Sequence, residues 1–148
     1  MVGHCVSILM ALSIANGSAA LAEQARSINQ AVPEIAALEP ELESLYRDLH
    51  EHPELAFHEQ RTAAALADRL RALGFEVTTQ VGGTGLVAIL RNGSGPVVML
   101  RTELDALPIE EKTGLPFANK AKGLDSEGKM VSVAHACGHD LHMAGWYG

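Results

Sequence analysis

The chain has 148 residues, of which 47% are hydrophobic and 20% charged, a globular composition that excludes a disordered or low-complexity chain. Acidic residues outnumber basic ones by 18 to 11, and the net charge of −7 gives no electrostatic support for nucleic-acid binding. Two cysteines are too few for a disulfide scaffold.

The first 22 residues contain no Lys, Arg, Asp or Glu. Their apolar run, Cys5 to Ala15, is too short to span a bilayer, which takes about 20 residues, so no membrane span is expected. Small residues follow it, ending in Ala20-Leu21-Ala22. This pattern predicts a signal peptide over residues 1–22 and export to the periplasm or the cell exterior, with a buried N-terminal helix as the alternative. Cleavage after Ala22 would leave Cys137 as the sole thiol.

Two helices are expected after a polar, Ala-rich leader over residues 23–40. Apolar residues recur at helical spacing between Leu42 and Leu49, and His52-Pro53 should end this helix because the residue before proline disfavours the α region. The second helix is expected over Glu59–Leu73, where the apolar residues share one stripe.

Short strands are expected to follow the helices. The sequence predicts a strand over Phe75–Thr79, a turn at Gly82–Gly85, a strand over Leu86–Leu90 and a strand buried on both faces over Val97–Leu100. Residues 109–130 read as irregular, Val131–Val133 as a short strand and Leu141 onward as a helix. These elements indicate an α/β fold with a mixed sheet flanked by helices. Few residues that could form helices over the sheet follow the last expected strand, so the chain is expected to be the N-terminal part of a larger domain.

The densest polar cluster runs from His135 to His142. It holds four potential metal ligands, three imidazoles and the thiol of Cys137, together with the carboxylate of Asp140. Thiolates and imidazoles bind zinc, manganese or cobalt, and a carboxylate can orient a neighbouring ring. A polar loop with a buried thiol is the alternative interpretation.

Two further polar groups accompany this cluster. Glu103 and Asp105 follow the expected buried strand, where open α/β sheets bind ligands, and their alternation lets both face one side; ordinary loop solvation is the alternative. His50 and His52 flank a helix end, where histidines more often cap and pack the turn than bind metal. Glu111 is expected to be exposed beside Glu110.

Five segments in one order between residues 45 and 145 resemble the metal-dependent amidohydrolase family of aminoacylases, hippurate hydrolases and auxin-conjugate hydrolases, which is related to the carboxypeptidase G group. The matching segments are Leu49–Leu55, Val81–Gly85, Arg101–Pro108, Thr113–Phe117 and His135–His142. The resemblance implies that residues 41–148 are the N-terminal part of a zinc-peptidase-like catalytic domain.

The resemblance also implies roles for individual residues. Cys137 and His139 are expected to be ligands of a two-metal site for Zn, Mn, Co or Ni, with the Cys137 thiolate shared between the ions. Asp105 is the family's supporting acid at the catalytic centre, and Glu103 stands where many members carry Asp. Asp140 and His142 match the motif as supporting residues rather than as ligands.

The implied reaction is metal-dependent hydrolysis of the amide bond of N-acyl amino acids or similar small amides. In the family the general base, the further ligands and a lid domain that mediates dimerisation lie downstream of this motif, so a homodimer is expected only of the full-length enzyme. The 148-residue chain alone is therefore expected to bind metal weakly and to lack amidase activity. The alternative function is a small exported metal- or thiol-based binding protein that uses Cys137.

Overall fold

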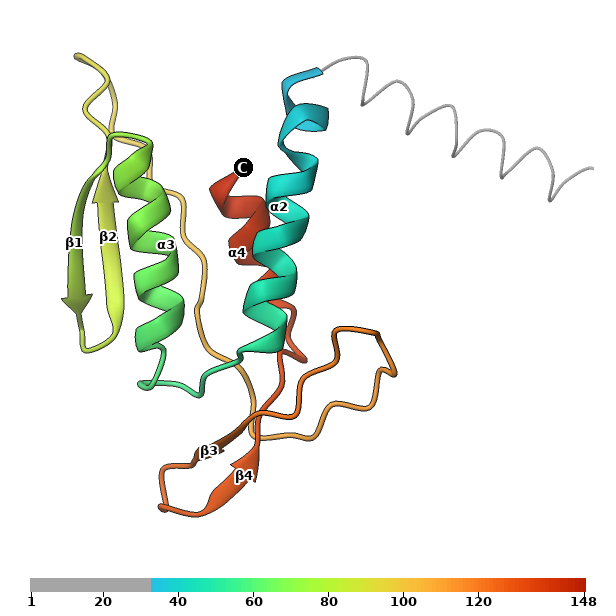
Figure 1. Ribbon diagram of the computed structural model, residues 1–148. Helices are drawn as coiled ribbons and strands as arrows, with labels where there is room; N and C mark the ends of the chain where they lie inside the picture. The colour runs from blue at the N-terminus through green and yellow to red at the C-terminus, as the bar shows by residue number, and fades with distance from the viewer. Residues whose placement is uncertain (1–32) are drawn as a thin grey trace, which may run out of the picture. The chain divides into compact units, whose positions relative to one another are not determined.

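The computed structural model describes residues 33–148 (Figure 1). The predicted signal peptide over residues 1–22 and the first part of the leader lie outside the described residues. Within residues 33–148, no helix combines the length and the apolar character needed to cross a membrane. The elements are α2 (Pro33–Glu51), α3 (Gln60–Ala72), β1 (Glu76–Val81), β2 (Gly85–Ile89), β3 (Lys122–Leu124), β4 (Met130–Ser132) and α4 (His139–Tyr147).

The three helices agree closely with the sequence predictions. Helix α2 begins inside the predicted leader and ends at Glu51, directly before His52-Pro53, as expected. Helix α3 covers Gln60–Ala72 and buries one stripe of its surface. Helix α4 begins at His139, two residues earlier than predicted. Residues from Pro40 onward form one compact unit, to which the packing described below belongs.

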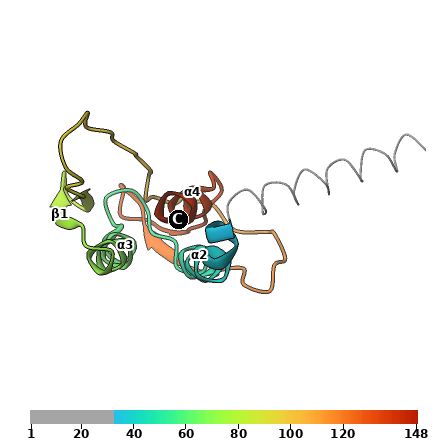
Figure 2. The ribbon, with the colours of Figure 1, turned by 90° about the horizontal axis from the view of Figure 1, so that it is seen from above.

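Strands β1 and β2 form the predicted antiparallel hairpin, in which Glu76 pairs with Ile89 and Thr79 with Leu86. Gly82 and Gly83 make its turn with φ angles of +66° and +117°, backbone conformations that favour glycine. Helix α3 packs against this hairpin, as Figures 1 and 2 show from two directions.

The strand predicted over Val97–Leu100 is wrong. These residues form no strand, and their exposed fractions range from 73% to 97%. A strand needs a hydrogen-bonding neighbour, and β1 and β2 pair only with each other in the described part of the chain.

Only one of the two strands of the second hairpin is predicted by the sequence. Strand β4 matches the predicted short strand within one residue, whereas β3 was missed because Lys122-Gly123-Leu124 has neither β-branched residues nor apolar alternation. Over residues 33–148 the strands form two separate antiparallel pairs, so the partial α/β domain is present but the single mixed sheet is not.

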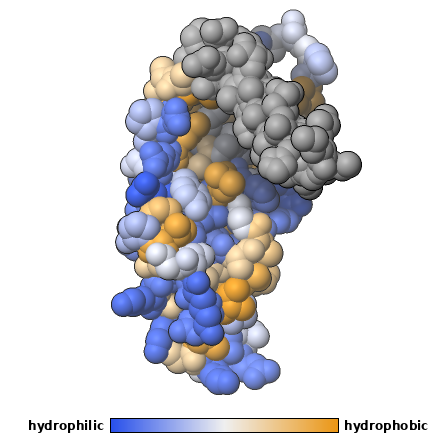
Figure 3. Space-filling view, turned by 90° about the vertical axis from the view of Figure 1, so that its right-hand side faces the viewer, coloured by the Kyte–Doolittle hydropathy of each residue, from blue (hydrophilic) through white to orange (hydrophobic). Residues whose placement is uncertain are grey.

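The main core lies where the three helices meet. Leu45 and Leu49 of α2 pack with Leu66 of α3 and with Met143 and Ala144 of α4, and all five are at most 3% exposed. Burial of such apolar surface is the dominant stabilising term in a domain of this size. On the face shown in Figure 3, hydrophobic residues also reach the surface in patches between hydrophilic ones.

A smaller core links the loops that carry the polar motifs. Leu55, Ala106 and Val133 form a buried cluster. Isolated bridges pair Leu55 with Ala106 and Leu107 with Ala134. They fix the loop over residues 103–108 between the α2–α3 connection and the segment that leads into α4, and so bring the sequence motifs together.

Candidate metal centre

His139 is held between the two acids that sequence analysis selected. Its Nδ1 lies 2.8 Å from the backbone oxygen and 3.2 Å from Oδ1 of Asp105, and its Nε2 lies 3.1 Å from Oε2 of Glu103. A ring that donates Nδ1–H to Asp105 can use the lone pair of Nε2 for a metal ion once Glu103 moves away, the arrangement that metal-binding histidines use. The expectation that both acids face one side is confirmed, since both contact this ring.

The chain turns sharply just before this histidine. Gly138 precedes the first residue of α4 with a φ of +77°, a left-handed conformation that disfavours side chains. Cys137, the residue before it, is exposed and carries a free thiol. A solvent-accessible thiol and an imidazole oriented by Asp105 are donors that suit zinc and similar ions.

These donors do not form a complete metal site by themselves. Within residues 33–148, no three His, Cys, Asp or Glu side chains are arranged to hold a metal ion. Catalytic zinc ions take three protein ligands. Cys137 and His139 are two donors, one fewer than such an ion takes from the protein.

The other two histidines of the motif lie in different surroundings. His135 is 8% exposed, and in the described part of the chain neither of its ring nitrogens has a hydrogen-bond partner. Burial lowers the pKa of His135, which favours the neutral ring. His142 is exposed on α4, with its ring centroid 6.1 Å from that of His139.

His50 lies in a buried ionic network. Its Nδ1 is 2.7 Å from Oδ2 of Asp140 and its Nε2 is 3.1 Å from Oε1 of Glu111, and none of the three side chains is more than 7% exposed. Burial lowers the pKa of His50, but the hydrogen bonds to Asp140 and Glu111 outweigh it and raise the pKa. Asp140 also accepts a 2.8 Å bond from the backbone of Leu141, so both of its oxygens have partners within the fold. His50 therefore packs at the end of α2, the role that histidines at helix ends were expected to have more often than metal binding.

Glu111 completes this network from the irregular segment. Its Oε2 accepts 2.6 Å bonds from the backbone and side-chain amides of Asn119, and the Thr113 hydroxyl donates to Oε1. Burial raises the pKa of Glu111, but the hydrogen bonds from Thr113, His50 and Asn119 lower it to about 2. The prediction that Glu111 is exposed is wrong, because a carboxylate beside Glu110 in an irregular segment gives no sequence sign of partners far along the chain.

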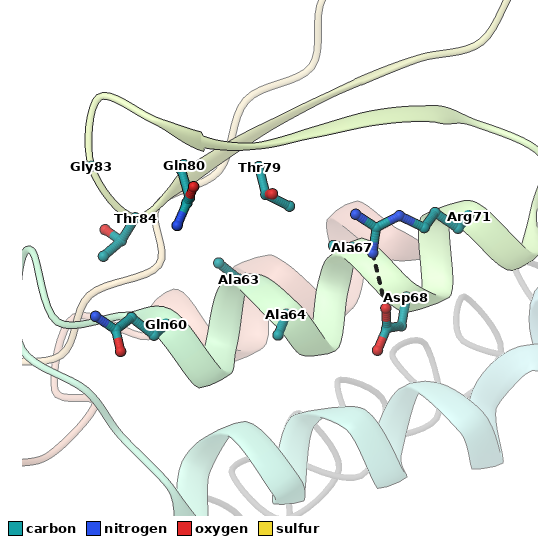
Figure 4. Close-up of a pocket in the computed structure, with 10 residues that line it drawn as sticks. All are labelled: Gln60, Ala63, Ala64, Ala67, Asp68, Arg71, Thr79, Gln80, Gly83 and Thr84. Carbon is teal, nitrogen blue, oxygen red and sulfur yellow. Dashed lines mark hydrogen bonds and ion pairs between the residues drawn. The ribbon is translucent and has the colours of Figure 1, made fainter.

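Glu103 and His142 line an open surface hollow of about 290 Å³, and two further cavities lie near the start of α3 and along its hairpin side. A cavity of about 450 Å³ is lined by Glu103, Asp105 and His139 together with Phe57 and residues of the turn after β1. A second cavity, of about 340 Å³, lies between α3 and the hairpin, where Ala63 faces Gln80 (Figure 4). The second cavity holds none of the predicted site residues.

Comparisons with known proteins agree with the motif. No protein-family model matches the chain. The hippurate hydrolase of Campylobacter jejuni is 41% identical over 112 residues, which is 75% of this chain and 27% of that protein. The N-acetyl-L-cysteine deacetylase of Bacillus subtilis is 39% identical over 129 residues, which is 86% of this chain and 28% of that protein.

A solved structure gives the same result for the fold. The YXEP protein of Bacillus subtilis, a dinuclear metal-binding peptidase of the M20 family, superposes with a TM-score of 0.62 and 40% identity over 74% of this chain and 28% of that one. This chain spans 11–28% of the length of the first curated relatives that it matches. Over the matched residues, the chain is similar in sequence to the hippurate hydrolase and the deacetylase and in fold to the M20-family peptidase, which agrees with the resemblance that its motifs indicated.

Proposed function

We propose that this chain forms part of a metal-dependent amidohydrolase that cleaves the amide bond of N-acyl amino acids or similar small amides. Hippurate and N-acetylcysteine, which appear in the names of two relatives, are both N-acyl amino acids. The structural neighbour is described as a dinuclear metal-binding peptidase. Sequence, fold and motif chemistry therefore support the same reaction class.

The observation that carries the proposal is the setting of His139. Asp105 binds Nδ1 through both its backbone and its carboxylate, which orients the ring and leaves Nε2 as the donor atom in a cavity of about 450 Å³. Nε2 also lies 3.1 Å from Oε2 of Glu103, whose side chain is 48% exposed and can move to solvent when an ion binds.

In this proposal Cys137 and His139 supply two ligands of a divalent metal site, and Asp105 orients His139. Bound metal would polarise the amide carbonyl and lower the pKa of a coordinated water. Within residues 33–148 no third His, Cys, Asp or Glu is arranged with them to hold an ion. This chain's own contribution is therefore to present one thiolate and one oriented imidazole to the ion.

Cobalt binding followed by absorption spectroscopy tests the metal site. Co²⁺ is expected to give a thiolate-to-cobalt charge-transfer band that Cys137→Ser abolishes and His58→Ala, a change at an exposed histidine elsewhere, leaves intact. Asp105→Asn should weaken binding by about 10-fold to 100-fold, the usual effect of losing a partner that orients a ligand. An unchanged band in Cys137→Ser would contradict the assignment.

The reaction is tested by incubating N-benzoylglycine and N-acetylcysteine with the full polypeptide that the source cell produces. Release of the amino acid should require metal and should be lost in Cys137→Ser. Release that survives both chelation and this substitution would overturn the proposal. Stoichiometric metal binding without hydrolysis, unaffected by Asp105→Asn, would instead favour a metal- or thiol-binding protein.

A further inference from the structure

The first turn of α4 carries His139, and its own structure does little to fix where that residue lies. Gly138 leads into the helix in a left-handed conformation, and among residues 33–148 no side chain caps it by a hydrogen bond. With nine residues, α4 is too short to be stable by its internal hydrogen bonds alone. The position of His139 therefore depends on the contacts that α4 makes with the rest of the fold.

Helix α4 lies beside α2, as Figures 1 and 2 show from two directions, and packs one face on the core. Asp140, Met143 and Ala144 share that face at helical spacing, and each is at most 3% exposed. Met143 and Ala144 join Leu45 and Leu49 of α2. Apolar packing is non-directional, so it holds the helix against the core without fixing its rotation.

Hydrogen bonds supply the directional contacts between α4 and α2. Tyr147, at the end of α4, donates a 2.7 Å bond to Glu41 at the surface. In the first turn, Asp140 accepts a buried 2.7 Å bond from Nδ1 of His50. A hydrogen bond weakens steeply when its angle departs from linearity, so the bond from His50 fixes the rotation of the turn that carries His139.

His50 is itself held from its other side. Its Nε2 lies 3.1 Å from Oε1 of Glu111, whose second oxygen accepts two 2.6 Å bonds from Asn119. A ring that is bonded at both nitrogens cannot turn without breaking one of these bonds. Glu111, His50 and Asp140 thus form a rigid support under the first turn of α4.

The loop that receives His139 is fixed by residues outside α4. Leu107 and Ala134 exchange two backbone hydrogen bonds of 3.0 Å, which hold the loop that carries Asp105. The backbone oxygen of Asp105 accepts the 2.8 Å bond from Nδ1 of His139. Because the loop does not follow α4, a small rotation of the helix would take Nδ1 of His139 out of reach of Asp105.

We propose that His50 is a positioning residue for His139: through its bond to Asp140 it sets the rotation of the first turn of α4, so that His139 keeps its bond to Asp105 and presents Nε2 at the cavity. The role of His139 as a metal ligand rests on the proposed function, whereas the coupling between the two rings does not.

Two substitutions at residue 50 separate the two bonds of its ring. In His50→Asn the amide nitrogen takes the place of Nδ1 and keeps the bond to Asp140, whereas in His50→Gln it takes the place of Nε2 and keeps the bond to Glu111. Each variant loses one buried hydrogen bond, so a purely structural role predicts similar changes in both. A positioning role predicts that only His50→Gln disturbs His139.

Nitrogen NMR of the His139 ring in the metal-free full chain is the first measurement. A backbone oxygen can only accept, so the bond to Asp105 requires a proton on Nδ1 of His139. The parent and His50→Asn should show this single tautomer, and His50→Gln should show a mixture of both tautomers. Leu70→Ala, a buried change on α3, should destabilise the fold and leave the single tautomer in place.

Amide hydrogen exchange in the first turn is the second measurement. The His142 amide donates a 3.0 Å bond to the Gly138 oxygen, and its exchange reports local opening of this turn. Exchange there should be about 10-fold faster in His50→Gln than in His50→Asn. Equal behaviour of the two variants in both measurements, or a mixture of tautomers in Leu70→Ala, would overturn the positioning role.

A second pair of variants makes the same comparison if a change at residue 50 prevents folding. The Asp140 carboxylate accepts bonds from both His50 and Leu141, and an asparagine has one oxygen for the two. Asp140→Asn should therefore disturb the His139 ring, whereas Glu111→Gln, which leaves the bond to Asp140 in place, should not. Equal effects of these two changes would again overturn the positioning role.

Cobalt binding separates this inference from the proposed function. Co²⁺ should bind about 10-fold more weakly to His50→Gln than to His50→Asn, the size of effect that follows when a ligand loses its orientation. Because the NMR and exchange measurements need no metal, a parent chain that shows no cobalt band contradicts the proposed function alone. A cobalt band in the parent with no difference between the two variants in tautomer or exchange overturns the positioning role alone.

Discussion

Two histidines in this protein have the same kinds of neighbours in opposite surroundings. His50 has an aspartate at Nδ1 and a glutamate at Nε2, and so has His139. We call the first group, with Asp140 and Glu111, the buried trio, and the second, with Asp105 and Glu103, the open trio. In the buried trio every side chain is at most 7% exposed, whereas in the open trio the exposed fractions are 14% for the histidine, 30% for Asp105 and 48% for Glu103.

The difference shows that burial, rather than residue type, decides whether such a trio stabilises the fold or can bind a ligand. Buried charges must stay paired, so the buried trio locks α2, α4 and the irregular segment together. Exposed pairs contribute little stability, so Glu103 can leave Nε2 of His139 when a ligand arrives. His139 and Asp140 are neighbours in sequence, and the first turn of α4 thus joins the two trios.

The largest expected effect separates the two trios by stability. His50→Ala should lower the free energy of unfolding by about 3–5 kcal/mol, because it leaves two buried carboxylates without their partner. His139→Ala in the metal-free chain should cost about 1 kcal/mol or less, because its partners regain water. Urea unfolding of both variants at one pH makes the comparison. Equal losses would show that the open trio is also a structural element.

The buried trio should also set the response to acid. The pKa of Glu111 is lowered to about 2 from 4.5, so as the pH falls the unfolded chain takes up this proton first. The stabilisation that is fully present above pH 4.5 should be lost towards pH 2, by an amount on the order of 1–3 kcal/mol. The pKa of His50 is raised above 6.5, so its contribution is present below pH 6.5 and is lost as the pH rises through the folded-state value.

Unfolding free energies measured from pH 2 to pH 8 check both limbs. Glu111→Gln should flatten the acid limb, whereas Glu110→Gln, at the exposed neighbouring residue, should leave it unchanged. An acid limb that persists in Glu111→Gln would place the titrating group elsewhere.

The members of the open trio could be selected from sequence, whereas the buried trio could not. Local spacing made Glu103, Asp105 and His139 candidates, and the family resemblance, rather than spacing, gave Asp105 and His139 their expected roles. The bond between His50 and Asp140 joins residues 90 apart in sequence, and no periodic pattern relates them. Local patterns likewise predicted α3 and the first hairpin correctly.

The prediction at Val97–Leu100 failed for a related reason. An apolar β-prone run shows that a segment suits a sheet, but pairing depends on a partner strand that the run itself does not specify. The same limit applies to β3, whose strand conformation comes from its pairing with β4 rather than from its own residues.

Another prediction sharpens the comparison by using a histidine that has no hydrogen-bond partner among residues 33–148. His135 is about as buried as His50, but neither of its nitrogens is hydrogen-bonded. His135→Leu should change the free energy of unfolding of the metal-free chain by about 1 kcal/mol or less, or raise it, because it removes an unsatisfied polar group. His50→Leu should destabilise strongly. A loss at His135→Leu as large as that at His50→Leu would reveal a partner that the fold supplies to His135.

The smallest expected effect concerns how the irregular segment is held against the buried trio. Phe117 presents its ring to His50 at 5.4 Å between centroids, and the Arg47 guanidinium carbon lies 4.6 Å from the centre of the same ring. Arg47→Gln should cost about 0.5–1 kcal/mol, because it removes the cation–π contact with Phe117 together with the exposed ion pair to Glu43. Arg71→Gln, which removes only the exposed pair with Asp68, should cost less than about 0.5 kcal/mol.

Amide hydrogen exchange can show whether the Arg47 contact affects the segment that carries Glu111. If Phe117 fixes the segment that delivers Glu111, Arg47→Gln should speed exchange at the Asn119 amide, which donates to that carboxylate. Arg71→Gln should not, since Arg71 lies on α3 and contacts only Asp68 by ion pairing. Unchanged exchange at Asn119 would mean that the hydrogen bonds of Glu111 hold the segment without help from the ring, so that the buried trio stabilises its surroundings rather than depending on them.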